Sequence, residues 1–259
     1  MAGPSKSRMR GWVRSVEGAP ERKEPLTTTR IVDAAMALMA EQGYDAVSMR
    51  SLARALDTGP ASLYAHVANR DELDQLVIDR IASMVEVPAP DPERWADQLK
   101  ELMRVMLELY REHPGAARAA MAVIPTFEGG LRTAEGMMAI AIAGGISPQA
   151  AAWFCDLSSL YVGAIAYEEA IWVQRENSTE AGEDPDHEAL DEQLHAYFES
   201  LDPDRFPILT ALATQMTQGS GDERFEFGLD VLLAGLAAVS ERYGDGSSSR
   251  ATYPAGPRP

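Results

Sequence analysis

The 259-residue sequence contains one cysteine, few aromatic residues and no long uninterrupted hydrophobic run. The single Cys155 excludes a disulfide framework and a cysteine-based zinc site. No apolar run resembles a signal peptide, and the longest weakly polar stretch, residues 150–167, is interrupted by Asp156 and by serines. We therefore expect a cytoplasmic protein with no membrane partner.

Basic residues are also scarce, with 23 Lys and Arg against 40 Asp and Glu. The net charge of −17 would ordinarily argue against a nucleic-acid partner. Residues 1–80, however, contain 11 residues of each sign, so the whole acidic excess lies in residues 81–259. The first sixteen residues contain basic side chains and no acidic one. This asymmetry indicates two parts with different tasks.

Helical periodicity dominates the rest of the sequence, and no run of alternating β-branched residues indicates a strand. Because 46% of the residues are hydrophobic, the chain can bury a core, and we predict an all-α fold. Residues 1–25 and 244–259 are rich in Gly, Pro and Ser, which predicts disordered tails. The run Val87-Pro88-Ala89-Pro90 separates a small domain at 26–86 from a larger helical domain at 87–243.

Capping residues indicate where several helices begin. Asn69 and Glu72 have the spacing of a capping box, and Asp91-Pro92 gives an N-cap followed by proline at the first helical position. The expected helices are 27–43, 48–56, 60–66, 69–86, 91–110, 114–124, 128–143, 147–175, 187–200, 203–217 and 222–242, with a polar loop at 176–186.

Residues 48–66, SMRSLARALDTGPASLYAH, form two short helices around a tight turn. Ala53 is small where the two helices must cross, and Leu52, Leu56 and Leu63 are spaced to hold them against the first helix. Such a helix-turn-helix can project the N-terminal side chains of its second helix into the major groove of DNA.

These residues resemble the DNA-binding domain of the tetracycline-repressor family, most clearly in EQGYDAVSMRSLARAL and SLYAHVANRDEL. The segments YVGAIAYEEA and FEFGLDVLLAGL are similar to the regulatory domain of the branch that contains the tetracycline repressor itself. The resemblance covers roughly residues 27–242. It implies a dimeric, ligand-responsive regulator that represses transcription from a palindromic operator and loses DNA affinity when an effector binds.

The resemblance also assigns contacts with double-stranded DNA. It implies that Arg50 and the start of the second helix of the motif contact base edges. It implies that Tyr64, His66 and Arg70, and the helix N-terminus at Thr27 and Thr28, contact phosphates. Both assignments agree with the hydrogen-bonding chemistry of these groups. Taken singly, each position could be an ordinary surface or packing residue, but their shared spacing favours DNA binding. The predicted DNA-binding residues are Thr27, Thr28, Arg50, Pro60, Ala61, Ser62, Tyr64, His66 and Arg70.

Two positions depart from the family pattern. Asp57 stands where the family usually has glycine in the turn, and Asp tolerates the left-handed backbone expected there. Ala65 is small where a bulkier side chain is common, which weakens base readout on that side.

Residues 228–239 are apolar almost all round, so this helix must be covered on two sides. Either the helix is fully buried inside a monomer, or a second copy of the chain covers it in a homodimer. The resemblance implies the homodimer, in which the last two long helices pair across a two-fold axis. We expect the dimer interface to contain Gly228, Leu232, Gly235, Leu236 and Val239.

The resemblance places a small-molecule effector pocket in the larger domain, although aromatic and methionine residues at helical spacing are more often plain core. Asp156 either faces a partner arginine or lines a polar pocket. The candidate lining residues are Met103, Met106, Leu107, Tyr110, Phe127, Met137, Met138, Trp153, Asp156, Leu157, Tyr161 and Trp172.

No metal site and no cofactor are expected. His187, Asp191 and His195 share one helical face, but an exposed acidic helix explains them better than a divalent metal does. Aligning Gly115-Ala116 with the family segment that precedes the drug-binding histidine puts Ala119 at the position of that histidine, so tetracycline is not the expected ligand.

Two other functions compete with DNA-binding regulation. An enzyme would need a nucleophile motif or an acid–base constellation, and the sequence contains neither. A protein-binding module that has lost DNA binding would be consistent with Asp57 and Ala65.

Overall fold

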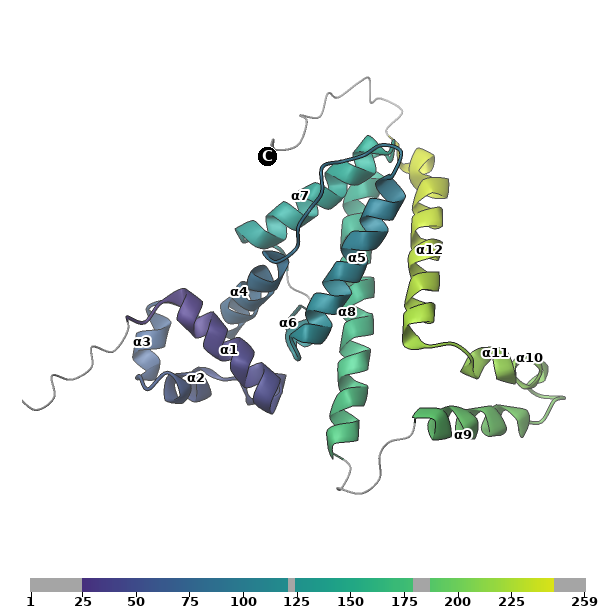
Figure 1. The fold of residues 1–259 in the computed structure, drawn as a ribbon, viewed down its shortest axis with the longest axis horizontal. Coiled ribbons are helices and arrows are strands. Elements are labelled where there is room, and N and C mark those ends of the chain that lie inside the picture. The colour runs from purple at the N-terminus through teal and green to yellow at the C-terminus, as the bar shows by residue number, and fades with distance from the viewer. Residues whose placement is uncertain (1–24, 121–123, 179–186, 245–259) are drawn as a thin grey trace, which may run out of the picture.

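The computed structural model describes residues 25–120, 124–178 and 187–244, and every regular element in these ranges is a helix (Figure 1). The all-α prediction is therefore confirmed for this part of the chain. The predicted tails and most of the predicted 176–186 loop lie outside the described residues.

The first elements form an N-terminal unit around one hydrophobic core. They are α1 (Thr28–Gln42), the 3-10 turn η1 (Tyr44–Ala46), α2 (Met49–Ala55), α3 (Pro60–Tyr64) and α4 (Arg70–Ala82). Their buried side chains include Ile31, Leu52, Leu63, Leu73 and Val77. This core fixes how α2 and α3 stand against α1.

Polar caps start these helices largely as predicted. The Thr27 hydroxyl accepts a hydrogen bond from the Arg30 amide at 3.2 Å, and Asn69 accepts one from the Glu72 amide at 2.8 Å. The Glu72 carboxylate, however, accepts from the amide of Ala68 at 2.5 Å, one residue before the amide that a capping box would use.

The turn between α2 and α3 contains the left-handed residue that the sequence predicts. Asp57 has a φ of 48° and is the one non-glycine residue with positive φ in the described ranges. The amides of Asp57 and Thr58 bond to the Arg54 and Ala53 carbonyls at 3.2 and 2.9 Å, which ends α2. Asp therefore makes the sharp reversal without loss of the motif.

The remaining elements form a larger C-terminal unit. They are α5 (Trp95–Glu112), α6 (Ala116–Ala120), α7 (Glu128–Ala143), α8 (Pro148–Ser178), α9 (His187–Glu199), α10 (Pro207–Ala211), α11 (Ala213–Thr217), α12 (Gly221–Val239) and η2 (Ser240–Tyr243). In Figure 1, α5 and α12 lie beside the long α8, and α9–α11 pack on one another at the end opposite α1–α3.

Several predicted helix boundaries are wrong. The third helix ends at Tyr64, before His66, and the predicted 203–217 helix is two helices that meet at Leu212. The helix expected from Asp91 begins at Trp95, because the Asp91 carboxylate accepts from the Glu93 amide at 3.0 Å and forms a separate turn.

A ladder of ion pairs ties α5 to α12 and α8. Lys100 binds Asp230, Arg104 binds Glu226 through two bonds of 2.5 and 2.7 Å, and Arg111 binds Asp222 at 2.6 Å. The residue numbers of the basic partners rise along α5 while those of their acidic partners fall along α12, so the two helices run antiparallel. Much of the scarce positive charge of this unit is thus used internally.

This ladder predicts acid sensitivity. Hydrogen bonds from Arg104, and then Lys100, lower the pKa of Glu226 to about 2 against the opposing effect of burial. A lowered pKa stabilises the fold above the ordinary value of 4.5, and this contribution is lost as the pH falls from there towards 2. Glu226→Gln should therefore lower the free energy of unfolding at pH 7 by about 1 kcal/mol or less, because the pair is partly exposed.

Urea denaturation from pH 7 to pH 2 checks this prediction, with the exposed Glu135→Gln on α7 as the matched control. The wild type should lose its advantage over Glu226→Gln as the pH falls below 4.5. A constant difference between the two proteins across this range would contradict it.

Candidate DNA interface and effector cavity

Helix α3 presents a polar face to solvent because one apolar residue anchors it. Leu63 is fully buried in the N-terminal core, whereas Ala61 and Ser62 are exposed and Tyr64 is 54% exposed. Pro60 occupies the first helical turn and His66 follows the helix, and both are also exposed. The structure therefore places all five predicted residues of this segment where another molecule can reach them.

Two neighbouring elements add donors to this exposed face. Arg50 is exposed on α2, which packs on α3, and Arg54 lies exposed one turn further along α2. The Thr27 hydroxyl accepts the bond that caps α1, so its own O–H can still donate to an anion, together with the backbone amides of the first turn, beginning with Thr28. Arg54 was not among the predicted contacts, and it lies four residues from Arg50 on the same helix.

Arg70 differs from the other predicted contacts because its guanidinium is directed into the protein. It binds the Asp74 carboxylate at 2.8 Å and the Val47 carbonyl, and its central carbon lies 4.1 Å from the Tyr44 ring centroid. A phosphate would have to compete with these bonds. The structure gives Arg70 a role in holding α4 against η1.

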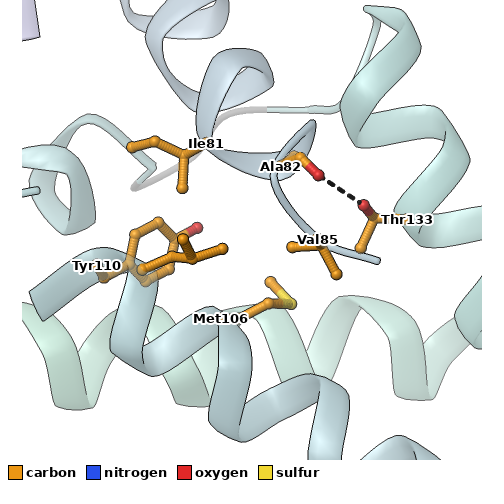
Figure 2. Close-up of a pocket in the computed structure, with 7 residues that line it drawn as sticks. Ile81, Ala82, Val85, Met106, Tyr110 and Thr133 are labelled. Atoms are coloured by element: carbon orange, nitrogen blue, oxygen red, sulfur yellow. Dashed lines mark hydrogen bonds between the residues drawn. The ribbon is translucent and has the colours of Figure 1, made fainter. Parts of the chain in front are cut away.

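A small apolar cavity lies where α4, α5 and α7 meet (Figure 2). Its volume is about 20 Å³, room for about one water molecule, so any larger ligand would need it to expand. Met106 and Tyr110 were predicted to line a pocket and do so here. The remaining lining residues are Ile81, Ala82, Val85, Leu109 and Thr133.

Polar groups at this cavity are few. The Thr133 hydroxyl donates to the Gly129 and Ala82 carbonyls at 3.1 and 3.3 Å, which links α7 to the end of α4. Burial raises the pKa of the Tyr110 phenol to about 12. The phenol therefore stays protonated and can donate a hydrogen bond to a ligand. Sequence reasoning missed the α4 side of this site, although apolar Val85 just after a polar helix end was a signal.

The other predicted pocket residues do not line this cavity. Met103, Leu107 and Met137 are core, and Phe127 and Met138 are partly buried elsewhere. Tyr161 stacks on Phe225 of α12 with ring centroids 5.6 Å apart. The following four predicted residues are exposed on α8 in the single chain: Trp153, Asp156, Leu157 and Trp172.

Asp156 is exposed in the single chain, on the same side of α8 as Trp153 and Leu157. The prediction assumed a carboxylate buried within an apolar helix, but Asp156 lies on the solvent side of α8 in this chain. Water can solvate it in the single chain, and the choice between a partner arginine and a polar pocket stays a prediction for the assembled protein.

The predicted interface residues of α12 also need correction. A Cβ on Gly228 would lie 1.9 Å from the Tyr161 hydroxyl, so this glycine admits the ring of its own chain. Leu236 is buried and Leu232 packs against the same core, while Val239 is partly buried. Of the two predicted interface glycines, only Gly235 has room for a side chain, since a Cβ there would meet no atom within 4 Å. The exposed stripe of α12 consists of Phe227, Val231, Ala234, Gly235 and Ala238.

Two further features bear on the alternatives. Among the residues that the structure describes, no group of three or more His, Cys, Asp and Glu side chains could hold a metal ion. One helical stretch in them, Pro148–Val173, is long and apolar enough to cross a membrane by length and composition alone. Part of this stretch is the α8 face that packs on the C-terminal core.

Two family models match the chain. One is described as bacterial regulatory proteins of the tetR family and covers residues 31–75, and the other as a tetracyclin repressor-like C-terminal domain and covers residues 87–240. ActR from Streptomyces coelicolor, solved without ligand, is 41% identical with a TM-score of 0.73, over 85% of this chain and 98% of its own. Solved structures of ActR also contain (S)-DNPA or actinorhodin.

Curated relatives agree. The transcriptional repressor DrrR1 of Streptomyces coeruleorubidus is 28% identical over 86% of this chain and 82% of its own length. The class G tetracycline repressor protein of Vibrio anguillarum is 30% identical over 80% of this chain and 91% of its own length. The chain therefore belongs to the tetR family of helix-turn-helix transcriptional regulators, a non-enzymatic family of DNA-binding proteins.

Proposed function

We propose that the protein is a cytoplasmic homodimeric repressor that binds a palindromic operator and releases it when a small-molecule effector binds. The observation on which this rests most is the position of the cavity. It lies between α4, the last helix of the DNA-binding unit, and α5 and α7 of the C-terminal unit. A ligand there contacts both units at once.

DNA binding is assigned to the exposed face of α2 and α3. Arg50 can donate to a base edge, Ala61 can contact a thymine methyl group, and Tyr64 can donate to a phosphate. The acidic excess lies in the other unit, which need not approach DNA. Thr27, Thr28, Ser62 and His66 complete the proposed contacts.

Dimerisation is assigned to the apolar stripe of α12 and the neighbouring exposed face of α8. Val231 is 53% exposed on α12, and Trp153 and Leu157 are 56% and 48% exposed on α8. A second copy would cover both helices through an isologous contact, which also explains why α8 is apolar on two sides. A two-fold dimer would present two α3 helices to half-sites at least one helical turn apart.

Effector response is assigned to expansion of the cavity. A ligand that needs more room than one water molecule must displace the end of α4 at Ile81 and Val85. Because α4 also belongs to the DNA-binding unit, a ligand that binds the displaced arrangement better shifts the population away from the one that fits the operator. The ligands named for ActR are reasonable first probes.

Mutation of the exposed face tests the DNA assignment. Arg50→Ala should weaken operator binding by about 5- to 150-fold and relax the base preference, the range expected for a lost base contact. Tyr64→Phe should weaken it by about fivefold without changing preference, since one phosphate hydrogen bond is lost. Titration at fixed salt measures both, with the exposed Arg94→Ala on the other unit as control, and unchanged binding of both variants would rule out this surface.

Charge on the α12 stripe tests the dimer. Val231→Asp should convert the dimer to monomers in sedimentation analysis, because a carboxylate would be buried without a partner. Ala37→Asp, on the exposed side of α1, is the matched control and should remain dimeric. A dimeric Val231→Asp would place the interface elsewhere.

Selection of genomic fragments by the purified protein tests the function as a whole. We expect enrichment of one palindromic sequence, and binding of that sequence should weaken by about 5- to 150-fold when a cognate effector is present. Actinorhodin and (S)-DNPA are the probes to add first. Enrichment of no single site would instead favour a module that has lost DNA binding.

A further inference from the structure

A cluster around Tyr44 joins the two units. Tyr44 lies in η1 of the N-terminal unit, and two guanidinium groups contact its ring. Arg70 of α4 lies 4.1 Å and Arg118 of α6 lies 5.0 Å from the ring centroid. The Tyr44 cluster consists of Tyr44, Asp45, Arg70, Asp74 and Arg118.

One side of this cluster is buried and belongs to the N-terminal unit. Asp74 is only 7% exposed, and it accepts hydrogen bonds from the Tyr44 hydroxyl at 2.5 Å and from Arg70 at 2.8 Å. Separating a buried carboxylate from both donors would be costly. Tyr44 and α4 must therefore move together.

The other side of the cluster is exposed and belongs to the C-terminal unit. Arg118 binds the Asp45 carboxylate at 2.7 Å, and their side chains are 41% and 75% exposed. Ion pairs and cation–π contacts at such exposed sites are weak. The contact with Arg118 can therefore break while the contacts with Asp74 stay.

The backbone around α6 is shaped for this contact. Gly115 has a φ of 88°, and a Cβ there would come within 3.3 Å of Met39 and 3.4 Å of Tyr44. This close approach brings the start of α6 onto the N-terminal unit, where Ala116 is buried in the core of α1–α4. The turn begins directly after α5, whose Tyr110 lines the cavity one helical turn upstream.

We propose that Tyr44 is a coupling residue, whose breakable contact with Arg118 sets the orientation of the DNA-binding unit against the effector-binding unit. This inference rests on the proposed function for its biological meaning. Movement at the end of α5 reaches Tyr44 through Gly115 and Arg118, and Tyr44 passes it to α4 through Asp74. The contact that breaks is that of Arg118 with Asp45 and the Tyr44 ring, while Ala116 at the start of α6 stays in the N-terminal core and η1 and α4 stay joined.

The first test measures the orientation without DNA or effector. Spin labels on Arg54→Cys of α2 and Glu135→Cys of α7, in a Cys155→Ser background, report the distance between the units by double electron–electron resonance. Labelled full-length chains are diluted with excess unlabelled protein so that each distance lies within one chain. Arg118→Ala and Asp45→Asn should both broaden or shift the distance distribution.

Arg205→Ala is the matched control, because Arg205 also stacks on an aromatic ring, that of Phe206 at 5.2 Å, but within one unit. It should leave the distribution unchanged. A distribution in Arg118→Ala equal to that of the wild type would overturn the proposal, whatever the outcome of operator selection.

The second test separates coupling from simple stability. Arg118→Ala should bind the selected operator with an affinity within about threefold of the wild type. Actinorhodin or (S)-DNPA weakens operator binding by some factor in the wild type, and in Arg118→Ala that factor should be at least about five times smaller. Arg118→Lys, which keeps the charge opposite Asp45 but not the planar stacking, should fall between the two. Full weakening in Arg118→Ala would count against coupling.

Failure of the two proposals can be told apart. If no operator is selected and the distances still respond to Arg118→Ala, the regulatory function is wrong and the orienting contact stands. If an operator is found and released by a probe, but Arg118→Ala changes neither the distances nor the release, Tyr44 has no coupling role.

Discussion

Helix α4 and the turn that follows it together fill two hydrophobic cores, and the arrangement of the two units depends on this. Leu73, Val77 and Ile81 complete the core of α1–α3, while Val85, just beyond the helix, enters the core of α5, α7, α8 and α12. No position of α4 can change in one core without changing in the other. The DNA-binding unit and the cavity therefore share the packing of α4 and of the turn that follows it.

Sequence patterns predicted the DNA-binding unit well because each local signal had one solution. Asn69 caps α4 as predicted, and Leu63, the apolar residue in the middle of a short helix, faces inward. Hydrophobic periodicity was not sufficient for α12. When both faces of a helix are apolar, periodicity shows which residues share a face but not which face its own chain covers. Gly228 was assigned to the partner, whereas Tyr161 occupies that space.

The charged residues give the same lesson. Net charge identified the unit that need not touch DNA, but it could not show that Lys100, Arg104 and Arg111 bind acidic residues of α12 and α8. Those partners lie 58 to 130 residues apart and are set by tertiary packing, which local spacing does not encode. Arg70 and Asp74, by contrast, are four residues apart on one helix, so local spacing did indicate that pair, and the family motif outweighed it. The acidic outer surface that results opposes DNA binding in the wrong orientation.

Thermodynamic linkage gives the most direct test of the central claim, that one helix shared by two cores couples the cavity to the operator. Isothermal titration of an effector such as actinorhodin into the free protein, and into the protein saturated with operator, measures the coupling from the ligand side. The ligand should bind the operator complex more weakly than the free protein, by the same factor by which it weakens operator binding. Equal ligand affinity for the free and operator-bound protein would contradict it.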